Sequence, residues 1–68
     1  MTLREYRDSL AWSMSELARR AGLNYQTVSR IEQGQPAYRH TVAALAKALS
    51  EGLGRTITID DIKGVVIK

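Results

Sequence analysis

Residues 21–34, AGLNYQTVSRIEQG, are the stretch that decides the fold of this chain. Gly22 suits the left-handed residue that ends a helix, and Asn24 suits the polar cap that begins the next one. Apolar residues recur at helical spacing on both sides of this short connection. The stretch therefore predicts helices over about 14–21 and 25–33, joined as a helix-turn-helix.

The same capping pattern continues outward along the chain in both directions. Three pairs have the spacing of a capping box, in which each side chain satisfies a free backbone N–H: Thr2 with Glu5, Ser13 with Glu16, and Thr58 with Asp61. With glycines at the expected helix ends and an apolar stripe in the second half, the pattern predicts five helices: about 3–11, 14–21, 25–33, 39–51 and 59–63. The tail VVIK is predicted to be extended, with the composition of a short edge strand.

The predicted fold class is all-α, one compact five-helix domain over residues 1–68. A chain of 68 residues is near the lower limit for folding on a single core, which leaves no room for a separate catalytic or sensing domain. It has no cysteine and a single histidine, His40, so we expect no disulfide and no metal site. No cofactor or small-molecule effector is implied. An enzyme is disfavoured, because no carboxylate pair is set in an evident pocket.

Charge and hydropathy indicate the kind of partner. Ten Lys and Arg against seven Asp and Glu give a net charge of +3 and a pI of about 9.7. This balance weakly favours a polyanion such as nucleic acid. No apolar run approaches the roughly 18 residues of a membrane span, and the first residues do not resemble a signal peptide. We therefore expect no membrane partner and a cytoplasmic protein, associated with the nucleoid when bound to DNA.

One side of the predicted helix 25–33 is rich in hydrogen-bonding groups. At about 100° per residue, five side chains fall within an arc of about 140°: Tyr25, Gln26, Ser29, Arg30 and Gln33. Glutamine can pair with an adenine edge, and arginine with guanine or phosphate. This side therefore suits a helix lying in a major groove. The plainer interpretation of the same side chains is an ordinary solvated surface.

The segment LREYRDSLAWSMSELARRAGLNYQTVSRIEQG, residues 3–34, resembles the phage repressor/Cro-like (XRE-type) helix-turn-helix DNA-binding domains. The resemblance implies a lambda-repressor-like fold with 14–21 as the supporting helix and 25–33 as the recognition helix. It implies base reading by Tyr25, Gln26, Ser29 and Arg30. It implies contacts to the DNA backbone by Ser13, Met14, Asn24, Thr27, Gln33, Arg39 and His40. It also implies a structural ion pair between Arg7 and Glu32.

The chain departs from the family pattern at three places. Met14 replaces a usual polar residue, so only its backbone N–H at the helix start is expected to meet a phosphate. Trp12 replaces a usual aliphatic and enlarges the core. After Leu49, where the resemblance ends, the chain inserts SEGLGRTI before the last predicted helix. The structure of residues 50–68 is therefore left open.

These features predict sequence-specific binding of double-stranded DNA by a transcriptional repressor or regulator. Since one recognition helix reads only a few base pairs, we expect a homodimer on a palindromic operator. The dimer interface is expected within 53–68, on aliphatic residues: Ile57, Ile59, Ile62, Val65 and Ile67. In a second interpretation, Ile57, Ile59 and Ile62 close the core of the single chain. A second function also stays open, an antitoxin- or adaptor-type module that binds another protein through this surface.

Overall fold

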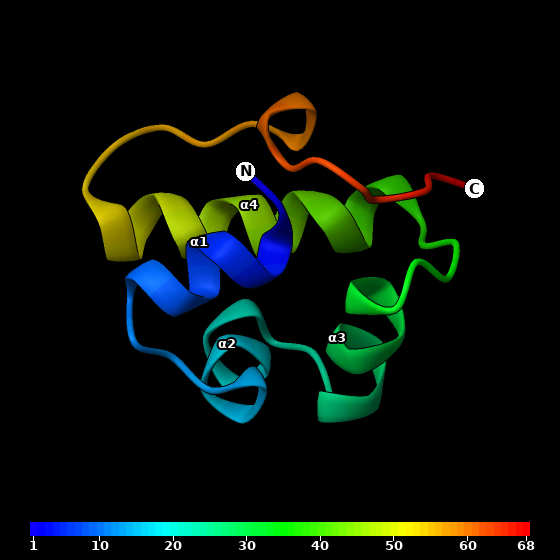
Figure 1. Cartoon of the computed structure of the whole chain (residues 1–68), viewed down its shortest axis with the longest axis horizontal. Helices are drawn as coiled ribbons and strands as arrows, with labels where there is room; N and C mark the ends of the chain where they lie inside the picture. Colours follow the sequence, from blue (N-terminus) through cyan, green and yellow to red (C-terminus); the bar gives the residue numbers. More distant parts are fainter.

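The computed structural model describes all residues from Met1 to Lys68. Four α-helices follow one another along the chain: α1 (Leu3–Ser9), α2 (Met14–Ala21), α3 (Tyr25–Glu32) and α4 (Arg39–Leu53). In Figure 1, the long helix α4 has α2 and α3 on one side and the C-terminal segment along the other. The all-α class agrees with the prediction. The predicted fifth helix is wrong, because only a 3-10 turn, Ile59–Asp61, forms there.

Polar side chains begin the first helices by binding N–H groups that no helical carbonyl can reach. Thr2 and Glu5 form the full capping box, with bonds of 3.1 Å to Thr2 Oγ1 and 2.7 Å to Glu5 Oε1. The bond from the Thr2 backbone N–H lowers the pKa of Glu5 below its ordinary value. The Ser13 hydroxyl accepts the Glu16 N–H at 3.0 Å. The reciprocal bond expected there is absent, because the Glu16 carboxylate binds two arginines of the same helix instead.

The connection between α1 and α2 turns at a residue that the sequence does not single out. α1 ends at Ser9 rather than at 11, and Ala11 has a φ of 57°. The Ala11 N–H donates to the Asp8 carbonyl at 3.0 Å, and the Trp12 N–H donates to the Arg7 carbonyl at 3.1 Å. This pair of bonds is the Schellman pattern of a helix end. Because an alanine Cβ disfavours this left-handed conformation, the two bonds and the packing of Trp12 must hold it in place.

Trp12 packs across the C-terminal part of α4, which is longer than predicted. The helix was expected to stop at 51, but it continues to Leu53 and ends at Gly54, whose φ is 71°. Gly52 lies inside the helix, and a Cβ placed on it would lie 2.5 and 2.7 Å from ring atoms of Trp12. The missing side chain at 52 therefore makes room for the indole ring.

We expect Gly52→Ala to destabilise the fold, against the usual effect of this substitution. In an unconstrained helix interior, alanine is more favourable than glycine by about 1 kcal/mol. Here the new methyl group must displace the indole of Trp12, and overpacking of this kind costs about 1–3 kcal/mol. Chemical denaturation should therefore show a lower free energy of unfolding. In a Trp12→Ala background the same change should be stabilising. A gain in stability in both backgrounds would contradict the packing.

The core lies where α4 meets the other helices. It is one cluster of 14 buried side chains, and none of them is charged. Five of them are completely enclosed: Leu17, Val28, Val42, Leu45 and Leu49. They come from α2, α3 and α4, so these three helices are fixed against one another by the same apolar contacts. The orientation of α3 therefore depends on the core and not on its own stability.

The segment after α4 closes over this core instead of forming a helix. Ile57 and Ile62 are each 4% exposed. The Ser50 hydroxyl accepts the Ile57 N–H at 2.8 Å, and the Asp61 carboxylate accepts the N–H and hydroxyl of Thr58 at 2.9 and 3.1 Å. The predicted helix 59–63 is too short for its few hydrogen bonds to offset the unfavourable free energy of helix nucleation, and its β-branched residues favour extended backbone. A single tight turn with an isoleucine buried on each side forms instead.

This placement corrects the expectation that Ile57 and Ile62 belong to a dimer interface. Both are enclosed by the core of the single chain, as the second interpretation of these residues holds. The other three residues expected there are partly buried against the same core: Ile59, Val65 and Ile67. Val66 is the large aliphatic side chain that this segment exposes, at 48%. An interface on this segment would therefore have to centre on Val66.

The C-terminal tail, residues 63–68, runs extended from the start of α1 to the loop after α3. Its first N–H donates to the Met1 carbonyl at 2.9 Å. Farther along, Ala37 donates its N–H to the Val66 carbonyl and accepts the Lys68 N–H, both at 2.8 Å. These contacts make isolated parallel bridges and no strand, so the tail is extended as predicted but forms no edge strand. The bonds to Ala37 hold Lys68 beside the loop that leads into α4.

Candidate nucleic-acid interface

The turn between α2 and α3 is the predicted helix-turn-helix. Gly22 has a φ of 71°, a conformation that glycine adopts without strain. Leu23 packs against the core. Asn24 then begins α3, with its Oδ1 accepting the Thr27 N–H at 2.8 Å. The turn leaves α3 beside α2, with both helices below α4 in Figure 1.

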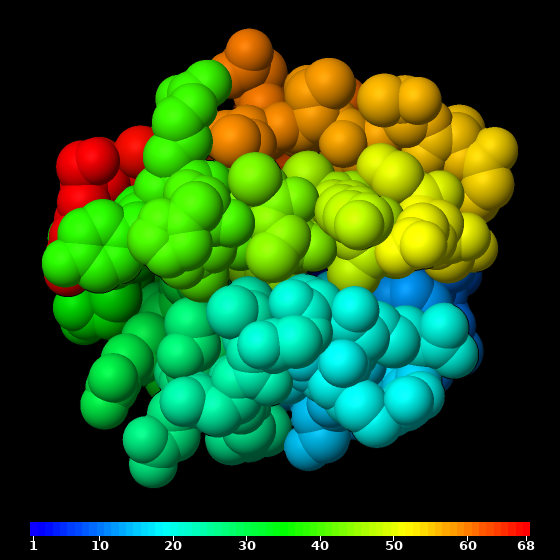
Figure 2. Space-filling view, turned by 180° about the vertical axis from the view of Figure 1, so that it is seen from behind, coloured from blue at the N-terminus to red at the C-terminus, as the bar shows by residue number.

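The outward side of α3 carries the residues implied for base reading. Tyr25, Gln26 and Arg30 are exposed, and Ser29 is partly buried. Gln33 Nε2 donates to Ser29 Oγ at 3.2 Å. All five side chains line one shallow hollow of about 250 Å³. In Figure 2, seen from behind, the side chains of this segment project from the lower left of the molecule. The fold thus brings these five residues together on one accessible surface.

The residues implied for backbone contact lie at the starts of helices, except Gln33, which follows the last residue of α3. Ser13 and Asn24 are already engaged as caps of α2 and α3. Thr27 Oγ1 donates to Asn24 Oδ1 at 3.0 Å. The Met14 side chain packs against the core, so its backbone N–H is what α2 presents at this position. The starts of helices attract anions, because their N–H groups and partial positive charge face outward.

The start of α4 carries the other two implied backbone contacts, Arg39 and His40, and both are exposed. The Tyr38 ring stacks on the His40 ring, with 5.6 Å between centroids and 12° between planes. Lys68 Nζ lies 4.5 Å from the centroid of the Tyr38 ring. Neither Tyr38 nor Lys68 was predicted here, because no local pattern places the tail beside this loop.

Arg7 and Glu32 join α1 to the end of α3. Arg7 Nε donates to Glu32 Oε2 at 2.8 Å, and Nη2 donates to Oε1 at 3.0 Å. The third guanidinium nitrogen, Nη1, donates to the Trp12 carbonyl at 3.0 Å. The hydrogen bond to Glu32 raises the pKa of Arg7 above its ordinary value. This is the ion pair that the resemblance implies, and it anchors the C-terminal end of α3 without using its outward side.

The cations of the chain differ in whether a carboxylate neutralises them. The four arginines of α1 and α2 all pair with Asp8, Glu16 or Glu32: Arg4, Arg7, Arg19 and Arg20. Hydrogen bonds from Arg19 and Arg20 also lower the pKa of Glu16. No carboxylate pairs with the cations at α3, the start of α4 and the tail: Arg30, Arg39 and Lys68. Three of the six cations without a carboxylate partner therefore lie on the side of the molecule that carries α3 and the start of α4, and the other three are Lys47, Arg55 and Lys63.

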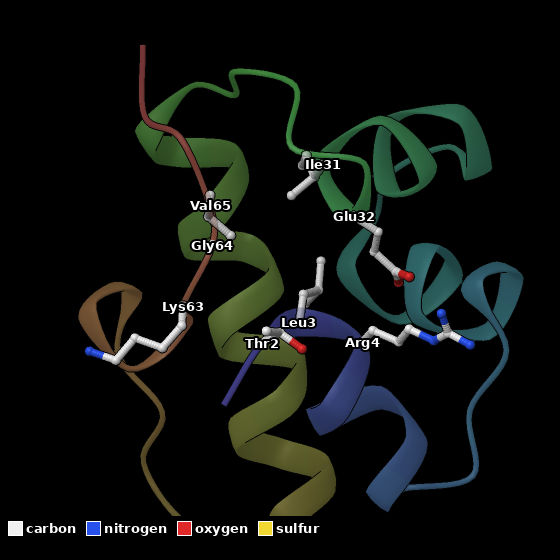
Figure 3. A pocket seen from close by; sticks show the side chains of 8 residues that line it. All are labelled: Thr2, Leu3, Arg4, Ile31, Glu32, Lys63, Gly64 and Val65. Atoms are coloured by element: carbon white, nitrogen blue, oxygen red, sulfur yellow. The ribbon is translucent and has the colours of Figure 1, made fainter.

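A further hollow of about 200 Å³ lies between α1, α3 and the C-terminal tail (Figure 3). Its one carboxylate, Glu32, is already paired with Arg7, so the hollow holds no free carboxylate. No group of histidine, aspartate or glutamate side chains is arranged to hold a metal ion. None of the helices combines the length and apolar character needed to cross a membrane.

Comparison with known families agrees with this geometry. A family model described as helix-turn-helix matches residues 3–59, which include all four α-helices. No curated protein and no solved structure matches the chain. The matched domain indicates a DNA-binding regulator. The chain therefore belongs to the Cro/C1-type (XRE) family of helix-turn-helix domains.

Proposed function

We propose that the protein recognises a specific sequence of double-stranded DNA with α3 in the major groove and acts as a transcriptional repressor or regulator. The observation that carries this proposal is the outward side of α3, where five polar side chains line one hollow next to cations without carboxylate partners. Base edges are read by hydrogen bonds, whereas phosphates are held by cations and helix N–H groups. The proposed base readers are Tyr25, Gln26, Ser29 and Arg30. The proposed backbone contacts are Ser13, Met14, Asn24, Thr27, Gln33, Arg39 and His40.

We propose further that two copies bind a palindromic operator. A single α3 spans only a few base pairs, and a two-fold dimer would place two such helices in successive major grooves, about 10 base pairs apart. The tail supplies an exposed aliphatic, Val66, flanked by partly exposed Val65 and Ile67. Covering this patch with a second copy would remove apolar surface from water.

Selection of bound DNA from a random pool, followed by sedimentation of the complex, tests both proposals together. We expect a palindromic site, two chains per site, and an affinity that falls steeply with salt. A pool that yields no preferred sequence would contradict specific readout. Salt-insensitive binding to a co-purifying protein, without DNA binding, would favour the antitoxin- or adaptor-type module instead. The exposure of Val66 would then belong to that partner's surface.

Val66→Asp is expected to give a folded monomer with weakened operator binding. The Val66 side chain is 48% exposed, so the substitution should leave the core intact while placing a charge in the proposed interface. Thr56→Asp is the matched control, because it adds the same charge at an exposed position in the loop after α4. Sedimentation and circular dichroism measure association and folding. Equal association of the two variants would contradict an interface at Val66.

A further inference from the structure

A notch between α3 and the start of α4 has the chemistry of an anion site. Its volume is about 250 Å³, and its lining comes from α3, the following loop, α4 and the tail. The polar side chains that line it are two cations and three hydroxyl groups: Arg30, Lys68, Thr27, Tyr38 and Thr41. No aspartate or glutamate side chain lines the notch. A group with negative charge and several acceptor oxygens would therefore meet donors on several sides and no acidic side chain that repels it.

Lys68 reaches this notch because the backbone of the tail is held on both sides of Ile67. Ala37 donates its N–H to the Val66 carbonyl and accepts the Lys68 N–H, each at 2.8 Å. The Lys68 ammonium lies over the Tyr38 ring, 4.5 Å from its centroid. A cation over an aromatic face is attracted to it but keeps its free N–H donors. Tyr38 thus acts as a platform that orients Lys68 without neutralising it.

The notch is continuous with the outward side of α3. Arg30 lines both this notch and the hollow formed by Tyr25, Gln26, Ser29 and Gln33. The tail, the start of α4 and α3 also lie on the same side of the molecule in two opposite views (Figures 1 and 2). A duplex that presents its bases to α3 would therefore carry a sugar-phosphate backbone past the notch.

We infer that Lys68 binds a phosphate of the DNA backbone next to the bases read by α3, with Tyr38 as its positioning residue. The inference rests on the proposed DNA binding and adds the C-terminal tail to the contact surface. The Thr41 hydroxyl, which also lines the notch, can donate to the same phosphate oxygens, whereas the Thr27 hydroxyl already donates to Asn24 Oδ1. Because a phosphate contact carries no sequence information, Lys68 contributes affinity and register rather than base specificity.

The experiment compares Lys68→Gln with Lys63→Gln on the selected operator over a series of salt concentrations. Both changes remove one positive charge from an exposed position on the same tail. The Lys63 side chain points away from Ile31 and Glu32 of α3 (Figure 3), so it serves as the matched control. Lys68→Gln should weaken binding by about three- to tenfold and reduce the slope of log K against log salt by about 0.9, the value for one lost phosphate contact. Lys63→Gln should keep the wild-type slope.

Tyr38→Leu tests the positioning role. It removes the aromatic platform and the hydroxyl but no charge, so it should weaken binding by a smaller factor than Lys68→Gln, and Tyr38→Phe, which keeps the ring, should bind nearly as tightly as wild type. Because the same ring stacks on His40, the two changes are combined in a His40→Ala background, where adding Tyr38→Leu to Lys68→Gln should weaken binding no further, since the ring acts through the ammonium. Independent, multiplicative losses would overturn the role given to Tyr38. Circular dichroism on each variant separates these effects from unfolding.

The possible results separate this inference from the function on which it rests. Wild-type binding with identical slopes and affinities for Lys68→Gln and Lys63→Gln would overturn the phosphate contact and leave DNA binding standing. A wild type that binds no DNA at low salt would overturn the proposed function and this contact together. A slope of log K against log salt that is reduced for Lys68→Gln but not for Lys63→Gln would support both DNA binding and the phosphate contact of Lys68.

Discussion

Arg7→Ala should lower the free energy of unfolding by about 2–4 kcal/mol. The Arg7 and Glu32 side chains are only 13% and 10% exposed, and two hydrogen bonds join them. Removing the guanidinium leaves the Glu32 carboxylate poorly hydrated and the Trp12 carbonyl without its donor. Glu32 belongs to α3 and the Trp12 carbonyl to the loop before α2, so removing the guanidinium should weaken the packing of α1 against both. Chemical denaturation measures it.

Arg4→Ala is the control for this prediction. Arg4 pairs with Asp8 at 3.8 Å, but the two side chains are 75% and 60% exposed. Water and salt screen such a pair, so its removal should cost less than about 1 kcal/mol. An Arg7→Ala protein as stable as Arg4→Ala would show that the Arg7–Glu32 pair is solvated in solution. Replacing both partners by apolar residues of similar volume should recover part of the loss, since no charge then remains buried.

Gln26→Ala and Arg30→Ala should each weaken binding to the selected operator by about 1–3 kcal/mol. Both side chains are exposed on α3, and they share one hollow with the other proposed base readers. Neither makes a side-chain hydrogen bond or ion pair within the chain, so the free protein should keep its helix content. Gln26→Ala should relax specificity at one base pair of each half-site and leave the salt dependence unchanged. Titration of wild-type and substituted operators measures both properties.

The loss of binding expected for Arg30→Ala can take two forms, depending on whether Arg30 contacts a base or a phosphate. If its guanidinium reads guanine, Arg30→Ala should relax specificity at a defined position. If it holds phosphate from the edge of the notch, all sequences should weaken alike and the salt slope should fall by about 1. Lys47→Ala on α4 is the control, because Lys47 is an exposed cation that lines a different hollow, between α2 and α4. Binding as tight as wild type in both Gln26→Ala and Arg30→Ala would mean that another surface meets the bases.

The helix-turn-helix itself could be predicted from the sequence because its determinants are local. Gly22 and Asn24 act on backbone groups within a few residues of themselves, and the structure has the turn and both helices at the predicted place. The outward side of α3 follows from the same helical period, since Val28 and Ile31 must face the core. The placement of these side chains can be predicted from the helical period and the capping residues alone, without the contacts of residues far away in the chain.

The rest was decided by contacts between residues far apart in the chain. The helix predicted over 39–51 was expected to end before Gly52, but Gly52 lies inside α4, where the Trp12 ring occupies the space of a side chain. Ile62 had the appearance of exposed interface, but the turn at 59–61 delivers it to the core. Lys68 carried no signal at all, and only its bonds to Ala37 bring it to the edge of α3. Local hydrogen bonding sets where a helix begins and ends, whereas which surface a flexible segment covers depends on the apolar area and donors that the folded helices present to it.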